Sequence, residues 1–187
     1  MLQQRKISVS VGFWILLGWF ALANGIGLTV MILLAALCHE VGHLLAICWQ
    51  GGTLYSISVT VFGAEMEVDT SNLSYGSELT CVLAGVAVNG VCGWAFGQVQ
   101  PVFAGVHWSL CVLNLLPIRP LDGGRALALV LRWGFDPVIS EWVTTVVERC
   151  VALILGVGLT WLVWETGGSL WLVPAAMAFL RLAVIKP

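Results

Sequence analysis

Residues 26–48 read IGLTVMILLAALCHEVGHLLAIC, and this stretch indicates the environment in which the chain folds. A helix that crosses a lipid bilayer needs about 20 mostly apolar residues, and this run is long enough. Its ionisable side chains, His39, Glu40 and His43, stand close together in its second half. Each such group costs about 2.5 kcal/mol or more at the centre of a bilayer. Their presence in one apolar run therefore indicates a functional site.

The composition of the whole chain also indicates a membrane protein. Of its 187 residues, 59% are hydrophobic and 10% are charged, and the formal net charge is −2. An average soluble domain carries about 25% charged residues, and a chain of this size cannot bury so much apolar surface in one core. The composition excludes a soluble enzyme and a disordered chain. The lack of excess positive charge argues against a nucleic-acid partner.

Apolar runs along the chain predict an all-α membrane protein with six transmembrane helices, forming one domain over residues 1–187. The expected spans are residues 8–24, 26–48, 77–96, 101–117, 143–164 and 168–185. Tight connections are expected at Asn24-Gly25, between Gly97 and Pro101, and between Glu165 and Gly168. No connection is long enough to hold an inserted domain.

The positive charges predict the orientation of the spans. With six crossings, all eight cationic residues fall on the side of the N-terminus: Arg5, Lys6, Arg119, Arg125, Arg132, Arg149, Arg181 and Lys186. Cytoplasmic loops carry the excess of Lys and Arg, so we expect a multi-pass protein of the cell membrane with both termini in the cytoplasm. Tryptophans are expected at the two interfaces: Trp94, Trp161, Trp164 and Trp171 outside, and Trp49, Trp133 and Trp142 inside.

Residues 53–69 depart from the helical pattern. Apolar and polar residues alternate on both sides of Gly63, which predicts a short membrane-associated β-hairpin between the second and third spans. We expect its first strand, residues 53–62, to be an edge strand. Such an edge could bind an unwound segment of another protein by β-augmentation, and the alternative is a lid that contacts no substrate.

Residues 117–124 form a second departure from the helical pattern. Pro117 and Pro120 remove amide donors and clash with the preceding turn, so the fourth span must break there. Irregular backbone at membrane depth is tolerated only against protein or a water-filled cavity. Helix resumes near Gly124, and Asp136-Pro137 predicts the start of the next helix.

The sequence His39-Glu40-Val41-Gly42-His43 has the spacing of a zinc site. Histidines at positions i and i+4 share one face of a helix, so both imidazoles can reach one ion. Zinc lowers the pKa of a bound water toward about 7, and the intervening Glu40 is placed to take its proton. Histidines that only bond to neighbouring carbonyls are the alternative. The cost of three ionisable groups in lipid argues against it.

Depth along the helices suggests the third ligand. At about 1.5 Å per residue, His39 lies about 20 Å from the outer surface, and Pro117 lies about 22 Å from it. Asp122 can therefore lie level with the two histidines, whereas His107 would lie far outward and is expected to be a packing residue. A simple helix cap is the alternative role for Asp122.

Asn89 and Asn114 are the remaining polar side chains deep within the expected spans. Their amides could donate to the carbonyl oxygen that gains negative charge during nucleophilic attack. They could equally serve as interhelical hydrogen bonds that hold the bundle together.

These motifs resemble those of the site-2 proteases, which are intramembrane zinc metalloproteases. The resemblance rests on HEVGH at 39–43 and on NLLPIRPLDGG at 114–124. A third segment, AGVAVN at 84–89, is similar to the family's Gly-Pro-x-x-Asn segment, with Val86 in place of proline. The resemblance implies that His39, His43 and Asp122 bind one zinc ion and that Glu40 is the general base.

The resemblance also implies the reaction, which is hydrolysis of a peptide bond in or near the transmembrane segment of a membrane protein, as in regulated intramembrane proteolysis. The compact chain resembles the bacterial, archaeal and sporulation-type branch without a PDZ or CBS domain. Expected partners are a transmembrane helical substrate, the lipid bilayer, and a regulatory membrane protein or a second copy of the chain, with no nucleic acid.

Two other functions fit part of the pattern. A divalent metal-ion transporter also places His and Asp side chains inside the membrane. An inactive relative could bind membrane helices without cutting them. Glu40 argues against both, because neither function needs a base beside the metal.

Overall fold

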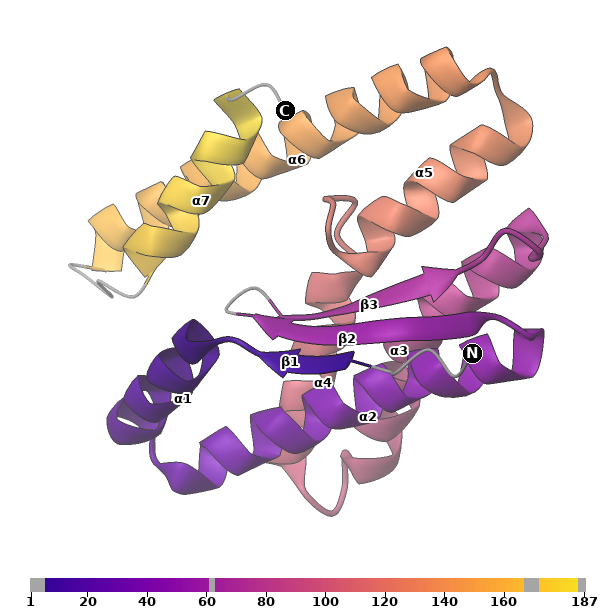
Figure 1. Ribbon diagram of the computed structural model, residues 1–187. Helices are drawn as coiled ribbons and strands as arrows, with labels where there is room; N and C mark the ends of the chain where they lie inside the picture. The colour runs from indigo at the N-terminus through magenta and orange to yellow at the C-terminus, as the bar shows by residue number, and fades with distance from the viewer. Residues whose placement is uncertain (1–5, 61–62, 167–171, 185–187) are drawn as a thin grey trace. The chain divides into compact units, whose positions relative to one another are not determined.

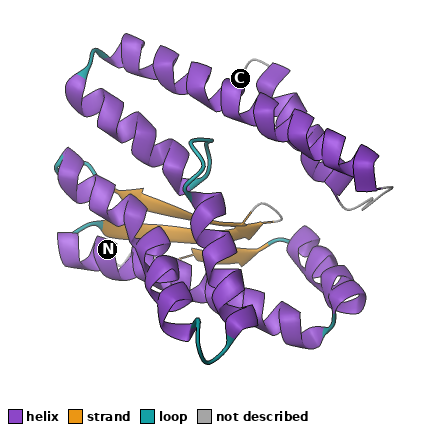
Figure 2. Ribbon diagram, turned by 180° about the vertical axis from the view of Figure 1, so that it is seen from behind, coloured by secondary structure: helices purple, strands orange, loops and turns teal. Residues whose placement is uncertain are grey.

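Helices make up most of the computed structural model, which describes residues 6–60, 63–166 and 172–184. The chain divides into two compact units, Met1–Leu113 and Asn114–Pro187. Both units are mainly helical (Figure 1), and the strands lie in the first unit as one small sheet (Figure 2). The prediction of a single domain over 1–187 stays a prediction.

The first unit contains four helices whose ends follow from local sequence. They are α1 (Val11–Asn24), α2 (Ile26–Gln50), α3 (Tyr75–Phe96) and α4 (Pro101–Asn114). Gly25, with φ of 88°, separates α1 from α2, and Gly51, with φ of 81°, ends α2. Glycine adopts these positive φ values without the steric cost that a Cβ atom brings.

The sheet contains three strands rather than the two expected. These are β1 (Lys6–Val9), β2 (Thr53–Thr60) and β3 (Gly63–Asp69), in the order β1-β2-β3. The predicted hairpin of β2 and β3 is confirmed as an antiparallel pair, and β1 pairs with β2 in parallel (Figure 1). The prediction that residues 53–62 form an edge strand is wrong, because β1 occupies that side of β2; residues 61–62 lie outside the described residues.

One face of β3 packs against the helices. Met66 and Val68 contact a buried cluster of Ala46, Ile47 and Cys81 from α2 and α3. The intervening residues Glu65 and Glu67 are exposed. The period-two alternation in the sequence therefore separates the packed face of the hairpin from its polar face.

Asp69 fixes the open end of the hairpin. Its carboxylate accepts hydrogen bonds from the Ser71 backbone N–H at 3.0 Å and from the Tyr55 hydroxyl at 3.0 Å. The hydrogen bonds from Ser71, followed by the one from Tyr55, hold the pKa of Asp69 below its usual value because they favour the charged form.

The second unit contains α5 (Asp122–Gly134), α6 (Pro137–Thr166) and α7 (Leu172–Val184). Helices α6 and α7 lie side by side (Figure 1), and a Cβ atom on Gly156 would lie 2.7 Å from the Leu180 side chain. The predicted helix start at Asp136-Pro137 is confirmed, since Asp136 accepts a hydrogen bond from the Val138 N–H at 2.8 Å.

Within the described residues, three helices are long and apolar enough to cross a membrane, namely α2, α3 and α6. The shorter apolar helices are Val11–Asn24, Pro101–Asn114 and Ala175–Val184. Six full-length spans are thus not confirmed. The expected first span began too early, because residues 8–9 belong to β1, and the fourth ends at Asn114 rather than 117, because a loop follows it. Residues 168–171 and 185 of the last expected span lie outside the described residues.

Candidate metal centre

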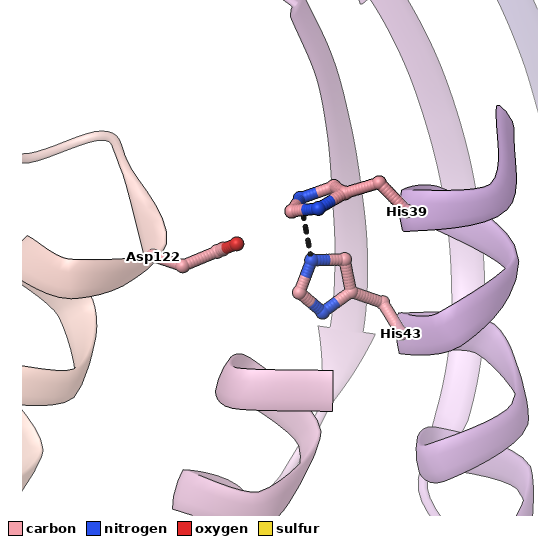
Figure 3. A group of neighbouring side chains, drawn as sticks. All are labelled: His39, His43 and Asp122. Carbon is pink, nitrogen blue, oxygen red and sulfur yellow. Dashed lines mark hydrogen bonds between the residues drawn. The ribbon is translucent and has the colours of Figure 1, made fainter. Parts of the chain in front are cut away.

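His39 and His43 lie on consecutive turns of α2, with their rings side by side in an edge-to-face arrangement (Figure 3). Their Nε2 atoms are 3.1 Å apart, and both residues are buried. Two nitrogens bound to one tetrahedral zinc ion at about 2.0–2.1 Å would lie about 3.3 Å apart. The observed separation therefore fits one ion shared through the two Nε2 atoms.

The other ring nitrogens of the pair face α3. Nδ1 of His43 lies 2.8 Å from the carbonyl oxygen of Cys81, to which it can donate. Nδ1 of His39 lies 3.1 Å from the side-chain amide of Asn89. Metal-binding histidines usually hold their second nitrogen in such a hydrogen bond, which fixes the orientation of the ring.

Gly85 on α3 makes room for the two rings. A Cβ atom at this position would lie 2.8 Å from Nδ1 of His39 and would overlap Nε2 of His43. On the facing helix, a Cβ atom on Gly42 would lie 3.0 Å from the carbonyl oxygen of Ala84. The close approach of α2 and α3 at these two glycines thus positions the histidine pair.

Asn89 and His107 lie beside this pair, and both are fully buried. Nδ1 of His107 lies 3.0 Å from Oδ1 of Asn89, and the rings of Phe96 and Phe103 pack around His107. The prediction that His107 lies far outward of His39 is wrong, since the side-chain amide of Asn89 is hydrogen-bonded to both histidines. The depth estimate counted residues from the outer end of each helix, and such a count gives relative depth only if the two helices start level.

The remaining predicted residues occupy α2 and α4. Glu40 follows His39 on α2 and is half-buried, and Asn114 is the last residue of α4 and is also half-buried. Their catalytic roles stay predictions.

In the second unit, Asp122 is the first residue of α5 (Figure 3). Its exposed fraction is 6%. Cβ atoms on Gly123 and Gly124 would overlap the backbone of Leu115 and of Ile118. The loop of residues 115–121 therefore folds back against the first turn of α5, and two glycines must follow the aspartate.

Arg119 ties this loop to α6. Its backbone N–H donates to Oε1 of Glu148 at 2.6 Å, and Nη2 donates to Oε2 of the same carboxylate at 3.0 Å. Nη1 donates to Glu141 at 2.7 Å. The hydrogen bond to Glu141, and then those to Glu148, raise the pKa of Arg119. Sequence reasoning missed this anchor, although a carboxylate at Glu148 inside an apolar run was a signal for it.

We expect Glu148→Gln to destabilise the second unit by about 1–3 kcal/mol, because hydrogen bonds to a buried charged group are lost or weakened. Thermal unfolding in detergent, followed by tryptophan fluorescence, measures the change. Glu141→Gln is the matched control, and its effect should be smaller because this side chain is 46% exposed. Equal effects of the two substitutions would contradict the anchoring role of Glu148.

The donor set of the predicted ligands fits zinc. His39 and His43 in the first unit and Asp122 in the second are each buried. Two imidazole nitrogens and one carboxylate oxygen are a donor set that catalytic zinc sites use.

Comparisons with known proteins give two sequence relatives, while no family model matches the chain. Stage IV sporulation protein FB of Bacillus subtilis is 25% identical over 162 residues, which are 81% of this chain and 56% of that protein. Rip3 of Mycobacterium tuberculosis, named as a zinc metalloprotease, is 28% identical over 163 residues, which are 78% of this chain and 39% of that protein. The chain thus spans about half or less of the length of these relatives.

A solved structure shares the fold. The site-2 protease from Methanocaldococcus jannaschii matches with a TM-score of 0.69 and 17% identity, over 100% of this chain and 94% of that one. The chain is thus similar in sequence to these two proteins and shares the fold of a site-2 protease.

Proposed function

We propose that this chain is an intramembrane zinc metalloprotease that hydrolyses a peptide bond in or near the transmembrane segment of a membrane-protein substrate, as in regulated intramembrane proteolysis. The observation that carries this proposal is the buried histidine pair on α2, with Nε2 atoms 3.1 Å apart and Glu40 between the two residues in sequence. The name of the Mycobacterium tuberculosis relative supports the same chemistry.

We assign His39, His43 and Asp122 as the ligands of one zinc ion per chain. When bound, zinc acts as a Lewis acid and lowers the pKa of water. Glu40 takes a proton from the attacking water and delivers it to the amine that leaves, which is the work of a general base followed by a general acid. A half-buried carboxylate on the same helix as the histidines is suited to this transfer.

Asn114 is our candidate for stabilising the carbonyl oxygen of the scissile bond, since a preorganised amide donor lowers the energy of the developing oxyanion. Asn89 was the other candidate from the sequence. Its amide is bonded to His39 and to His107, so we favour a supporting role for it.

We propose that the chain crosses the cell membrane six times, with both termini in the cytoplasm. Three long apolar helices and three shorter ones support this arrangement. The expected interfacial tryptophans that the structure describes are all exposed, as anchors at the membrane surface should be: Trp49, Trp94, Trp133, Trp142, Trp161 and Trp164. Trp171, Arg5 and Lys186 lie outside the described residues.

The edge of the sheet formed by β3 is our candidate site for the substrate. A transmembrane helix shields its carbonyls in intrahelical hydrogen bonds, so a substrate must unwind before water can attack. Strand β3 lies at one edge of the described sheet, and an unwound segment could pair with it by β-augmentation. Further expected partners are the lipid bilayer and a regulatory membrane protein or second copy of the chain, with no nucleic acid.

Removal of zinc tests the proposed reaction. We expect the purified protein, reconstituted in liposomes with a helical membrane substrate, to lose cleavage to background after chelation and to regain it when zinc is added back. Magnesium should not restore activity, because it prefers an all-oxygen octahedral set of ligands. Full activity after complete removal of zinc would contradict the proposal. Zinc flux into the liposomes without cleavage would instead indicate the transporter.

A further inference from the structure

Glu148 is a buried carboxylate on α6, and it stands inside the apolar run of residues 143–164. An ionisable side chain in such a run is costly unless it has a partner, and it is then a candidate for a functional role. The partner of Glu148 is the loop of residues 115–121, which leads into the first turn of α5. Asp122, the proposed zinc ligand of the second unit, is the first residue of that helix.

Every hydrogen bond recorded between Glu148 and this loop has Arg119 as its donor. Oε1 of Glu148 accepts the backbone N–H of Arg119 at 2.6 Å, and Oε2 accepts from Nη2 at 3.0 Å and from Nε at 3.3 Å. A backbone N–H and a guanidinium can only donate, so the direction of these bonds is unambiguous. One carboxylate thus holds both the main chain and the side chain of Arg119.

Glu141, the other carboxylate bonded to Arg119, makes a different kind of contact. It accepts from Nη1 of Arg119 at 2.7 Å and from Nη2 of Arg132 at 3.2 Å, and its side chain is 46% exposed. These donors lie at the ends of long side chains with many rotamers. A bond to them does not fix the course of the loop, whereas the bond from Glu148 to the backbone N–H does.

The backbone nitrogen that Glu148 holds is packed against the start of α5. A Cβ atom on Gly124 would lie 2.5 Å from the Arg119 nitrogen, and a Cβ atom on Gly123 would overlap the Leu115 carbonyl group. The backbone of the loop therefore lies directly on the turn that begins with Asp122. Because no side chain separates the two backbones, a shift of Arg119 must also move this turn.

Hydrogen bonds along the backbone join the same parts. The Leu121 N–H donates to the carbonyl oxygen of Ile118 at 2.8 Å, and the Arg125 N–H donates to the carbonyl oxygen of Leu121 at 3.1 Å. Ile118, which precedes Arg119, is 3% exposed. The loop and the first turn of α5 therefore form one hydrogen-bonded piece, and Glu148 holds that piece from α6.

We propose that Glu148 is a positioning residue of the zinc site, which keeps Asp122 in place through the backbone of Arg119. The proposal rests on the assignment of Asp122 as a zinc ligand in the proposed function. A ligand that is held in position before the metal arrives loses less conformational freedom on binding, so it binds more tightly. In this role Glu148 acts through Arg119 and is not itself a ligand.

Zinc affinity of the purified protein, measured by competition with a chromogenic chelator, tests the proposal. The side chain of glutamine has one acceptor oxygen, so it cannot serve both the N–H and the guanidinium of Arg119. Glu148→Gln should weaken zinc binding about 10-fold, the lower end of the range for residues that support metal ligands. Glu141→Gln removes an exposed charge from the same arginine and should change the affinity less than about 2-fold. Unchanged affinity in folded Glu148→Gln would overturn the proposal.

A double-mutant cycle separates positioning from a general loss of stability. Asp122→Ala removes the proposed ligand, so Glu148 has nothing left to position. In that background Glu148→Gln should change the remaining zinc affinity less than about 2-fold, because two substitutions that act through one contact are not additive. An equal loss of affinity in both backgrounds would show a merely structural role and would overturn the proposal.

Glu148→Asp takes the place of Glu148→Gln if the latter does not fold. It keeps the charge but shortens the side chain by one methylene group, so it should also weaken zinc binding in the wild-type background and not in Asp122→Ala. Unchanged affinity in folded Glu148→Asp would then overturn the proposal.

Neither measurement uses a substrate, so the two proposals can fail separately. Wild-type zinc affinity in Asp122→Ala would contradict the ligand assignment of the proposed function, and this inference with it. A loss of affinity in Asp122→Ala that simply adds to the loss in Glu148→Gln would contradict this inference alone. Non-additive losses in a protein that cleaves no substrate would support this inference and contradict the proposed function.

Discussion

Glu40→Gln is expected to keep zinc bound and to lower proteolysis by at least about 100-fold. A general base contributes about 10²- to 10⁴-fold to the rate of such a reaction. Glutamine has nearly the size of glutamate and keeps hydrogen-bonding atoms, but it cannot take a proton from water at neutral pH. The proposed ligands His39, His43 and Asp122 are all retained in this variant. Zinc content and cleavage of a reconstituted helical substrate are the two quantities to measure.

The matched control for this experiment is Glu165→Gln. Glu165 lies near the end of α6 and is exposed, so the same change of charge there should leave both zinc content and cleavage unaltered. Undiminished proteolysis in Glu40→Gln would contradict the assignment of Glu40 as the general base. Comparing membrane-protein fragments from cells that carry the active or the Glu40→Gln protein would then identify the substrate.

Gly85→Ala should produce the second large effect, a loss of zinc affinity and of cleavage of about 100-fold each. The added methyl group would overlap Nε2 of His43 and lie 2.8 Å from Cε1 of His39. Both rings must then move, or α3 must move away from α2. A misplacement of about 1 Å in a catalytic group can cost about 100-fold in rate.

Gly90→Ala on the same helix is the control for Gly85→Ala. Its added Cβ would lie 3.8 Å from Sγ of Cys111, which is an ordinary van der Waals contact. Alanine also favours helix over glycine by about 1 kcal/mol, so Gly90→Ala should keep zinc affinity and thermal stability. If Gly85→Ala bound zinc as tightly as the wild type, the prediction would be wrong, because the close contact of α3 with the histidine rings would not affect zinc affinity.

The sequence predicted the parts of the structure that depend on local periodicity. The i, i+4 spacing places His39 and His43 on one face of α2, and the alternation of Met66 and Val68 with acidic residues gives the hairpin. Strand β1 was missed because four residues carry too little periodic signal, and because its partner lies far along the chain. A parallel partner cannot be read from either segment alone.

Contacts between distant helices were the part that sequence could not provide. Gly85 was noted only as part of a motif, since nothing in residues 84–89 indicates that histidine rings lie against it. Arg119 was read as a marker of orientation, whereas in the structure it binds Glu148. His107 was misplaced because counting residues gives depth only if the helices start level. Each of these errors concerns tertiary packing and not the helices themselves.

The parallel pairing of β1 with β2 sets an order for assembly during synthesis. Ser8 of β1 meets Ser58 of β2, which is made 50 residues later. Parallel strands need a crossover connection, and here the crossover consists of α1 and α2. The sheet is therefore complete only after the helix that carries His39 and His43 has been made. An unwound segment that pairs with the finished sheet thus always meets a chain whose histidine helix is already present.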